Sequence, residues 1–326
     1  MTRRVLITGG FGYVGGRVAQ VLAVAGCEVR LGTRQASAST PDWLPTAELV
    51  SLNWSSRETL ESACEGMDTI VHLAAMNEID SARDPIAALR ANGVATLELL
   101  EAAIARGVRR FIYMSTAHVY GAPLQGRIDE RTLPRAQHPY AITHKVAEDF
   151  VLAAHDQGRI EGVVLRLSNG FGAPAHAGID RWTLLVNDLC RQAVVSGCLR
   201  LKSAGLQRRD FVTLQDVGGA VVHCLALRKV ALGDGLFNLG GDCTLRIIDM
   251  AQQVSERWEV MTGTGLPLER PEPSPGEILN EASVEPLVFS CAKLQATGFA
   301  LLSARDAEID ATLQLCLRAF GCAQSA

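Results

Sequence analysis

The sequence predicts an α/β fold with a doubly wound, largely parallel β-sheet and a smaller second α/β unit. In the first half of the chain, short β-branched segments alternate with helix-length amphipathic segments, which is typical of βαβ units. After about Ser168 the alternation becomes irregular, and loops carrying Gly and Pro separate the helices. We therefore expect one domain at 1–170, with some later segments returning to it, and a second at 171–326.

The expected strands are short and apolar, as buried parallel strands are. They are Arg4–Thr8, Glu28–Gly32, Glu48–Leu52, Thr69–Leu73, Arg110–Ser115 and Gly162–Leu167. Each expected helix of the first half is followed directly by a glycine, the residue that most readily adopts the left-handed conformation ending a helix. These helices are Tyr13–Ala25, Ile86–Arg106 and Tyr140–Gln157. In the second half we expect helices at Leu184–Ser196 and Leu245–Met261 and a Pro-rich connector at Glu269–Gly276.

The composition is that of an ordinary globular protein, with 326 residues, 48% of them hydrophobic, and a net charge of -4. This charge gives no sign of nucleic-acid binding. No apolar run reaches the roughly 18 residues of a membrane span, and the basic start MTRRVLITGG lacks the apolar core of a signal peptide. The nine cysteines are scattered without a C-x-x-C pair. This favours reduced thiols in a cytoplasmic protein over disulfides or a metal site.

The first motif, TGGFGYVGG, directly follows the first expected strand and opens the first helix. Gly9, Gly12 and Gly15 have the spacing G-x-x-G-x-x-G. Glycine allows a tight turn and a close approach of the backbone to a pyrophosphate, and the helix N-terminus supplies N–H groups and a positive dipole end. In this strand–turn–helix setting the motif predicts a Rossmann-type dinucleotide-binding domain rather than a merely structural turn.

Over nearly its whole length the chain resembles the extended short-chain dehydrogenase/reductase superfamily, in its nucleotide-sugar epimerase, dehydratase and ketoreductase branch. The resemblance rests mainly on HLAA (His72–Ala75), MSTAHVYG (Met114–Gly121), PYAITH (Pro139–His144), RLSNGFG (Arg166–Gly172) and RRDFVTLQDV (Arg208–Val217). It implies an NAD(P)(H)-dependent enzyme acting on a nucleotide-activated sugar, as a 4-epimerase or a 4-ketoreductase. NADPH is the usual diffusible hydride donor, so the preference for NADP(H) indicated by Thr33 and Arg34 slightly favours a reductase.

The end of the second strand bears on the choice of cofactor. NAD enzymes usually place an acid there to bind the adenosine ribose, whereas this chain has Thr33 followed by Arg34. Because Arg34 can pair with a 2′-phosphate, NADP(H) is favoured; NAD(H) remains possible if Arg34 is only a solvated loop residue. Asn53 replaces the acid usual in the family near the adenine. The resemblance adds as cofactor-binding candidates Tyr13, Val14, Leu73, Ala74, Ala75, Asn92 and Ser115.

The resemblance assigns the chemistry to Thr116, which would bind the substrate oxygen, and to Tyr140, which would exchange a proton during hydride transfer. The family's lysine holds the nicotinamide ribose and lowers the tyrosine pKa, but here His144 stands in its place. Histidine can hold a hydroxyl through a ring nitrogen, yet it lowers the tyrosine pKa only while protonated. Lys145 lies about 140° from Tyr140 around a helix and cannot simply replace the lysine.

Three alternatives therefore stay open for the chemistry. The first is an active Tyr140–His144 pair. The second is an enzyme in which another residue, such as His118 or Lys145, takes over. The third is a catalytically silent dinucleotide-binding or regulatory protein of the same fold.

The substrate side is less well defined by the sequence. Dehydratases of the resembled family carry an acidic pair where this chain has Ala117–His118, so a dehydratase of the usual kind is not expected. His118, Asn169 and Arg209 match substrate-binding positions, the arginine through the phosphates. Structural alternatives are a backbone hydrogen bond for His118, a loop cap for Asn169, and a salt bridge from Arg209 to Asp210 or Asp216.

The resemblance also implies a homodimer with twofold symmetry. Its interface would consist of the two expected helices Ile86–Arg106 and Tyr140–Gln157. The first of these has more apolar residues than one buried face needs: Ile86, Leu89, Leu97, Leu100 and Ile104. The alternative is that these apolar residues make an extensive contact with the core of the same chain.

Overall fold

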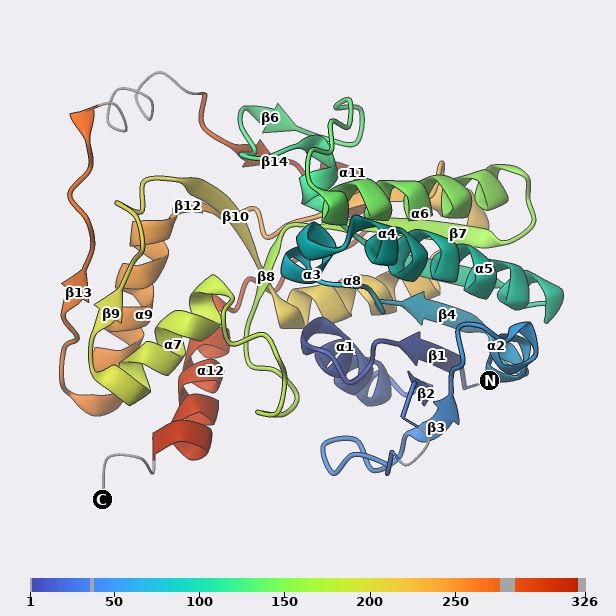
Figure 1. The fold of residues 1–326 in the computed structure, drawn as a ribbon, viewed down its shortest axis with the longest axis horizontal. Helices are drawn as coiled ribbons and strands as arrows, with labels where there is room; N and C mark the ends of the chain where they lie inside the picture. The colour runs from blue at the N-terminus through green and yellow to red at the C-terminus, as the bar shows by residue number, and fades with distance from the viewer. Residues whose placement is uncertain (1, 36–37, 276–284, 322–326) are drawn as a thin grey trace.

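The computed structural model describes residues 2–35, 38–275 and 285–321. Its centre is a seven-stranded parallel sheet with the order β11-β7-β5-β4-β1-β2-β3 (Figure 1). The chain runs outward from β1 through β2 to β3 and then returns to β4 on the other side of β1, which is the strand-order reversal that forms a ligand crevice at the carboxyl ends of the strands. The strands are β1 (Arg4–Thr8), β2 (Glu28–Thr33), β3 (Glu48–Ser51), β4 (Thr69–His72), β5 (Arg110–Thr116), β7 (Glu161–Leu167) and β11 (Leu236–Leu239).

Helices cover both faces of this sheet and enclose two apolar clusters. On one face, α1 (Tyr13–Val24) packs beside α8 (Leu214–Ala226), and both contribute to the first cluster. On the other face, α2 (Arg57–Cys64), α5 (Ala95–Ala105) and α6 (Pro139–Asp156) contribute to the second. The fold class expected from the sequence is confirmed.

The second unit gathers around a third apolar cluster, to the left in Figure 1. Its three-stranded sheet has the order β12-β10-β8, and a further pair joins β9 to β13. These strands are β8 (Asn169–Phe171), β9 (Leu199–Arg200), β10 (Arg208–Thr213), β12 (Thr244–Arg246) and β13 (Leu268–Glu269). The helices are α7 (Leu185–Ser196), α9 (Ile247–Thr262) and α12 (Arg305–Phe320). Further short elements are α3 (Glu78–Arg83), α4 (Pro85–Ala88), β6 (Arg127–Ile128), β14 (Val288–Phe289), α11 (Ala292–Gln295) and the 3-10 helices Ala117–Tyr120 and Lys229–Leu232.

The expected strands and helices of the first half agree closely with the structure, with one local difference. The helix expected at Ile86–Arg106 is α4 followed by a π-helical segment, Leu89–Val94, and then α5. The side chain of Asn92, inside the π-helical segment, is bonded to the Met76 N–H and to Thr143. Such widened turns commonly place a side chain for a specific contact. The Pro-rich connector extends to Gly276, which lies outside the described residues.

Two observations bear on the class of protein. The eight cysteines within the described part of the chain are all free. No helix among the described residues is long and apolar enough to cross a membrane.

Candidate active site

The glycine-rich turn lies at the crevice between β1 and β4, where only glycine fits. Gly9 has a left-handed φ of 72°, and a Cβ on it would lie 2.7 Å from the Ala74 nitrogen. A Cβ on Gly15 would lie 2.2 Å from the Gly9 carbonyl oxygen. Gly12 begins α1 without a side-chain cap. The first turn of α1 can therefore offer its N–H groups to a phosphate, so the turn fits a dinucleotide.

Other expected cofactor residues surround this turn. Leu73 and Ala74 directly follow β4, and their N–H groups donate to the backbone oxygen and the hydroxyl of Thr8. Thr33 ends β2 and Arg34 is exposed after it. The remaining expected neighbours are Val14, which packs against the first apolar cluster, Ala75, which is exposed, and Asn53, which is exposed and accepts a hydrogen bond from the Ser55 N–H.

The side chains of two further candidates are occupied within the protein. Tyr13 is buried, and its hydroxyl lies 3.0 Å from the Gly172 oxygen and 3.1 Å from Asn187 Oδ1. Asn92 Oδ1 accepts from the Met76 N–H at 2.7 Å, and its Nδ2 donates to Thr143 Oγ1 at 2.9 Å. Tyr13 therefore ties α1 to the second unit, and Asn92 ties the loop after β4 to α6.

Tyr140 faces a cavity together with three other ionisable residues, Glu78, His118 and His138. It is the second residue of α6, which His138 caps and Pro139 begins. The cavity has a volume of about 200 Å³ and is lined by Glu78, His118, Gly121, Ala122, Gln137, His138 and Tyr140. The structure thus brings Tyr140 and His118 together. Thr116 ends β5 close by in sequence, is buried, and its hydroxyl accepts from the His118 N–H at 3.2 Å.

His144 lies behind Tyr140 as a buried, uncharged group. The two rings form an edge-to-face pair with centroids 4.4 Å apart. Nδ1 of His144 lies 2.6 Å from the Tyr113 hydroxyl, and Nε2 is buried without a hydrogen-bond partner in the described part of the chain. Burial lowers the pKa of His144 to about 4. Burial, and then the charge of Glu78, raises the pKa of Tyr140. A neutral His144 cannot supply the positive charge that favours a phenolate.

Sequence reasoning missed an ion pair at this cavity. Glu78 begins α3, and its carboxylate lies 2.9 Å from Arg181, in the loop between β8 and α7. The contact connects the first unit with the loop that leads into the second. Neither residue belongs to a recognisable motif, and 103 residues separate them, so only the folded chain could show their contact.

The expected substrate residues Asn169 and Arg209 lie on the adjacent strands β8 and β10. Asn169 Nδ2 donates to the backbone oxygen of Asp210 at 2.9 Å, and Arg209 Nη2 donates to Gln207 Oε1 at 3.3 Å. The carboxylate of Asp210 accepts hydrogen bonds from the Ser168 hydroxyl and the Gly241 N–H. The salt bridge from Arg209 to Asp210 or Asp216, considered above as a structural alternative, is not formed.

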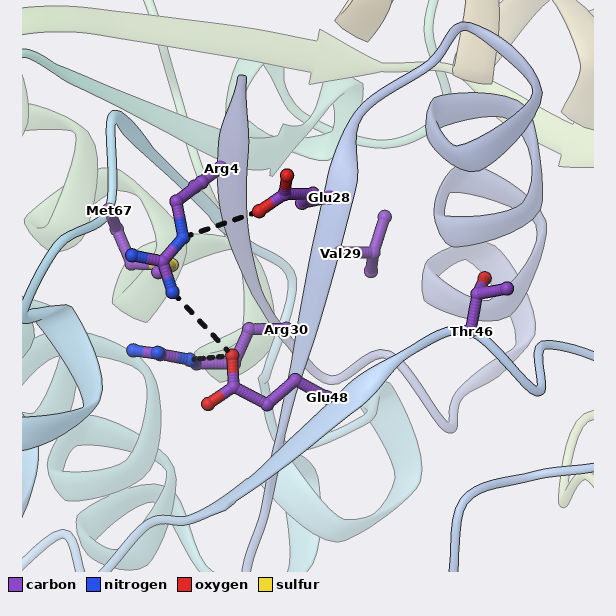
Figure 2. Close-up of a pocket in the computed structure, with 7 residues that line it drawn as sticks. All are labelled: Arg4, Glu28, Val29, Arg30, Thr46, Glu48 and Met67. Carbon is purple, nitrogen blue, oxygen red and sulfur yellow. Dashed lines mark ion pairs between the residues drawn. The ribbon is translucent and has the colours of Figure 1, made fainter. Parts of the chain in front are cut away.

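A second cavity, of about 130 Å³, lies at the opposite end of the sheet (Figure 2). It is lined by Arg4, Glu28, Val29, Arg30, Thr46, Glu48 and Met67. Figure 2 shows its charges pairing with one another: Arg4 with Glu28 at 3.5 Å, and Arg30 with Glu48 at 2.9 Å. Ligands of such sheets bind at the carboxyl ends of the strands, and this cavity is at their amino ends, so we do not assign it to the site.

A family model described as the NAD dependent epimerase/dehydratase family matches residues 5–240. The chain belongs to this family. The matched residues include the central sheet from the second residue of β1 onward, the glycine-rich turn and the helix that carries Tyr140 and His144.

Individual relatives agree with this assignment. The chain is 27% identical to a dTDP-glucose 4,6-dehydratase of Streptomyces niveus, over 77% of this chain and 76% of that protein. It is 32% identical to a UDP-glucose 4-epimerase of Rhizobium leguminosarum bv. trifolii, over 55% of each chain. Among solved structures, the fold is similar to that of a Thermus thermophilus UDP-glucose 4-epimerase in complex with NAD, with a TM-score of 0.77 and 24% identity over 97% of this chain and 99% of that one.

In this epimerase/dehydratase family member, Lys145 lies away from the site. It forms an ion pair with Asp149 on the outer side of α6. This agrees with the helical geometry, which separates Lys145 from Tyr140 by about 140°. The structure therefore gives no support to Lys145 as the substitute for the family's lysine.

A buried ion pair holds α6 against the sheet of this family member. Glu148 lies four residues after His144 and binds Arg166 of β7 through both carboxylate oxygens, at 3.0 and 2.7 Å. The Ser115 hydroxyl donates to the same carboxylate at 2.5 Å. The side chain of Ser115, a residue expected to bind the cofactor, is thus bonded to this ion pair. The one signal in the sequence is the helical spacing, which puts Tyr140, His144 and Glu148 near one face.

The buried neutral state of His144 predicts a loss of stability in acid. Between the ordinary histidine pKa, about 6.5, and the folded value of about 4, the unfolded chain binds a proton that the folded protein excludes. Stability from this residue is therefore fully present above pH 6.5 and falls as the pH drops, by about 2 kcal/mol between pH 7 and pH 5. Urea unfolding at both pH values measures it. His144→Gln should lose about 2 kcal/mol less over this interval; equal losses would contradict a buried neutral imidazole.

Proposed function

We propose that this protein is an NAD(P)(H)-dependent enzyme that acts on a nucleotide-activated sugar, as a 4-epimerase or a 4-ketoreductase. The observation that carries the proposal is the position of Tyr140, which lines a cavity of about 200 Å³ and has its ring 4.4 Å from that of His144. The glycine-rich turn, into which only glycine fits, supports dinucleotide binding. The named activities of the relatives support the choice of sugar nucleotides.

Each residue has a defined task in this proposal. The nicotinamide, when bound, accepts or supplies the hydride. Tyr140 exchanges a proton with the sugar oxygen, Thr116 binds that oxygen, and the Nε2 side of His144 binds a ribose hydroxyl. His118 and Asn169 contact the sugar, and Arg209 the phosphates.

The protonation state of Tyr140 supports the reductase over the epimerase. Reduction of a ketone begins from the neutral phenol, and burial favours that form by raising the pKa of Tyr140. Oxidation of a hydroxyl begins from the phenolate, and the neutral His144 does not help to form it. An epimerase needs both directions, whereas a reductase needs only the first.

Turnover assays distinguish the candidate functions. A reductase should consume NADPH or NADH in the presence of a 4-keto sugar nucleotide. An epimerase should interconvert UDP- or dTDP-sugars without net consumption of cofactor, as measured by NMR of the sugar. Binding of a dinucleotide with neither activity would overturn the proposed function and favour the catalytically silent alternative. The uncharged His144 is the observation that favours this alternative.

We further propose that NADP(H) is preferred over NAD(H). The support is the absence of an acid at the end of β2 and the exposed Arg34 after Thr33; the NAD in the complex of the Thermus enzyme argues the other way. NADPH should bind more tightly than NADH. Arg34→Ala should weaken NADPH binding about tenfold or more, since a charge-assisted hydrogen bond contributes about 1.5–3 kcal/mol, and should leave NADH binding nearly unchanged. Calorimetry that shows equal affinities for the wild type would reject the preference.

We also propose a homodimer formed through α4, α5 and α6, which lie side by side (Figure 1). Several large apolar residues are exposed along these helices and the π-helical segment: Ile86, Leu89, Val94, Ile142 and Phe150. Leu100, which the sequence suggested for this surface, is buried in the core instead. Ile142→Glu should convert the dimer to a monomer in light scattering, because dimerisation would bury the new charge. Val260→Glu, at an exposed site on α9, is the matched control. A wild type that is monomeric at micromolar concentration would refute the dimer.

A further inference from the structure

We propose that Tyr113 is a positioning residue for His144: its phenol fixes the imidazole in the tautomer whose Nε2–H is presented to a ribose hydroxyl of the dinucleotide. The second half of this statement rests on the proposed function, because it assumes that a dinucleotide occupies the site. The first half concerns the protein alone and is tested on the protein alone.

The contact between the two residues is short and closed to solvent. Tyr113 lies on β5 and His144 on α6, with exposed fractions of 1% and 2%. The hydroxyl oxygen of Tyr113 lies 2.6 Å from Nδ1 of His144. Because a strand and a helix hold the two groups and water is excluded, this hydrogen bond is part of the packed core.

The nearest competing imidazole, His72, is fully engaged elsewhere. Its ring lies 5.7 Å from that of Tyr113. One ring nitrogen of His72 lies 2.5 Å from Thr8 Oγ1 and the other 2.9 Å from Thr96 Oγ1. The Tyr113 hydroxyl therefore has the His144 imidazole, and not that of His72, as its hydrogen-bond partner.

Counting hydrogen bonds within the described residues assigns the tautomer. If the Tyr113 O–H donates to Nδ1, the only group of the pair left without a partner is the Nε2–H of His144. If Nδ1–H donates to Tyr113 instead, both the phenol hydrogen and the Nε2 lone pair are unsatisfied. Buried polar groups without partners are costly, so the first arrangement is favoured.

This tautomer leaves one donor for a ligand. Nε2 is buried without a partner in the described part of the chain, and the His144 ring lies 4.4 Å from that of Tyr140. In the proposal, a ribose hydroxyl oxygen is the acceptor for this N–H. A lysine would bring three donors and a fixed charge, whereas the Tyr113–His144 pair brings one directed donor and no charge. The pair thus retains the positioning role of lysine without its electrostatic role.

NMR of the dinucleotide-free protein, labelled with ¹⁵N-histidine, tests the tautomer. Long-range ¹H–¹⁵N correlations distinguish Nε2–H from Nδ1–H rings, and His144→Gln identifies the His144 signals. We expect neutral His144 with the proton on Nε2 at pH 7. Tyr113→Phe should change this pattern toward a mixture of tautomers. Tyr120→Phe, which removes another buried hydroxyl, bonded to Asn238 at 2.8 Å, should leave it unchanged. A proton on Nδ1 in the wild type, a charged ring, or no change in Tyr113→Phe would each overturn the proposal.

Calorimetry of NADH and NADPH binding tests the role toward the dinucleotide. Tyr113→Phe should weaken binding about tenfold, the effect of one misplaced hydrogen bond, and Tyr120→Phe should not. If the wild type binds neither dinucleotide, the proposed function fails while the NMR result still decides the pairing. If the wild type binds and Tyr113→Phe binds equally well, the positioning role is rejected. The wild-type spectrum needs no variant, so it decides the tautomer even if Tyr113→Phe does not fold.

Discussion

Tyr140→Phe is expected to lower the turnover rate by about 10²–10⁴-fold or more, while the dinucleotide stays bound. Positioned proton transfer contributes a factor of this size, and the variant deletes only the oxygen that would carry the proton. The ring of Tyr140, and with it the edge-to-face contact to His144 at 4.4 Å, is retained. We therefore expect the effect on the rate constant kcat rather than on cofactor affinity, as measured by steady-state kinetics and calorimetry.

Lys145→Ala is the matched control for Tyr140→Phe. Lys145 is on the same helix, but it pairs with Asp149 on the outer side, so its removal should leave turnover nearly unchanged. Turnover that survives Tyr140→Phe undiminished would show that the chemistry lies elsewhere, with His118 on the same cavity wall as the first residue to test. A wild type without turnover would instead favour the silent alternative.

Local patterns in the sequence were sufficient for the parts of the fold that depend on neighbouring residues. Buried parallel strands such as β1 and β5 are short apolar runs, and the glycine-rich turn needs its residues in consecutive order. The helix expected at Tyr140–Gln157 agrees to within one residue at each end with α6, Pro139–Asp156. The family resemblance was confirmed for the same reason, since the motifs that carry it are local.

Long-range placement could not be predicted in this way. Strand β11 joins the central sheet beside β7 although about 70 residues separate them, and its four residues carry too little pattern to identify it. The contact of Tyr113 with His144 spans 31 residues, and that of Glu78 with Arg181 spans 103. Tyr13 was assigned to the cofactor from its position in a motif, but its side chain points to Gly172 and Asn187, which only the packing of the second unit determines.

The largest expected effect on stability comes from breaking the ion pair between Glu148 and Arg166. Their side chains are 0% and 2% exposed and are joined at 2.7 Å. Removing one partner leaves a buried charge unpaired, which typically costs about 3–5 kcal/mol. Glu148→Leu and Arg166→Met should each lower the unfolding free energy by about this amount in urea titrations. The double variant should recover much of the loss, because it leaves no buried charge.

An exposed ion pair of nearly equal length provides the control for this prediction. Arg200 and Glu269 lie 2.8 Å apart with side chains 63% and 59% exposed, and Glu269→Leu should cost less than about 1 kcal/mol. If Glu148→Leu costs no more than this control, the carboxylate does not hold α6 in place. If it costs the expected amount, loss of the ion pair should also displace Tyr140 and His144, because these residues lie about two turns and one turn, respectively, before Glu148 on the same face of α6. We therefore expect Glu148→Leu to lower kcat under conditions in which the protein is still fully folded.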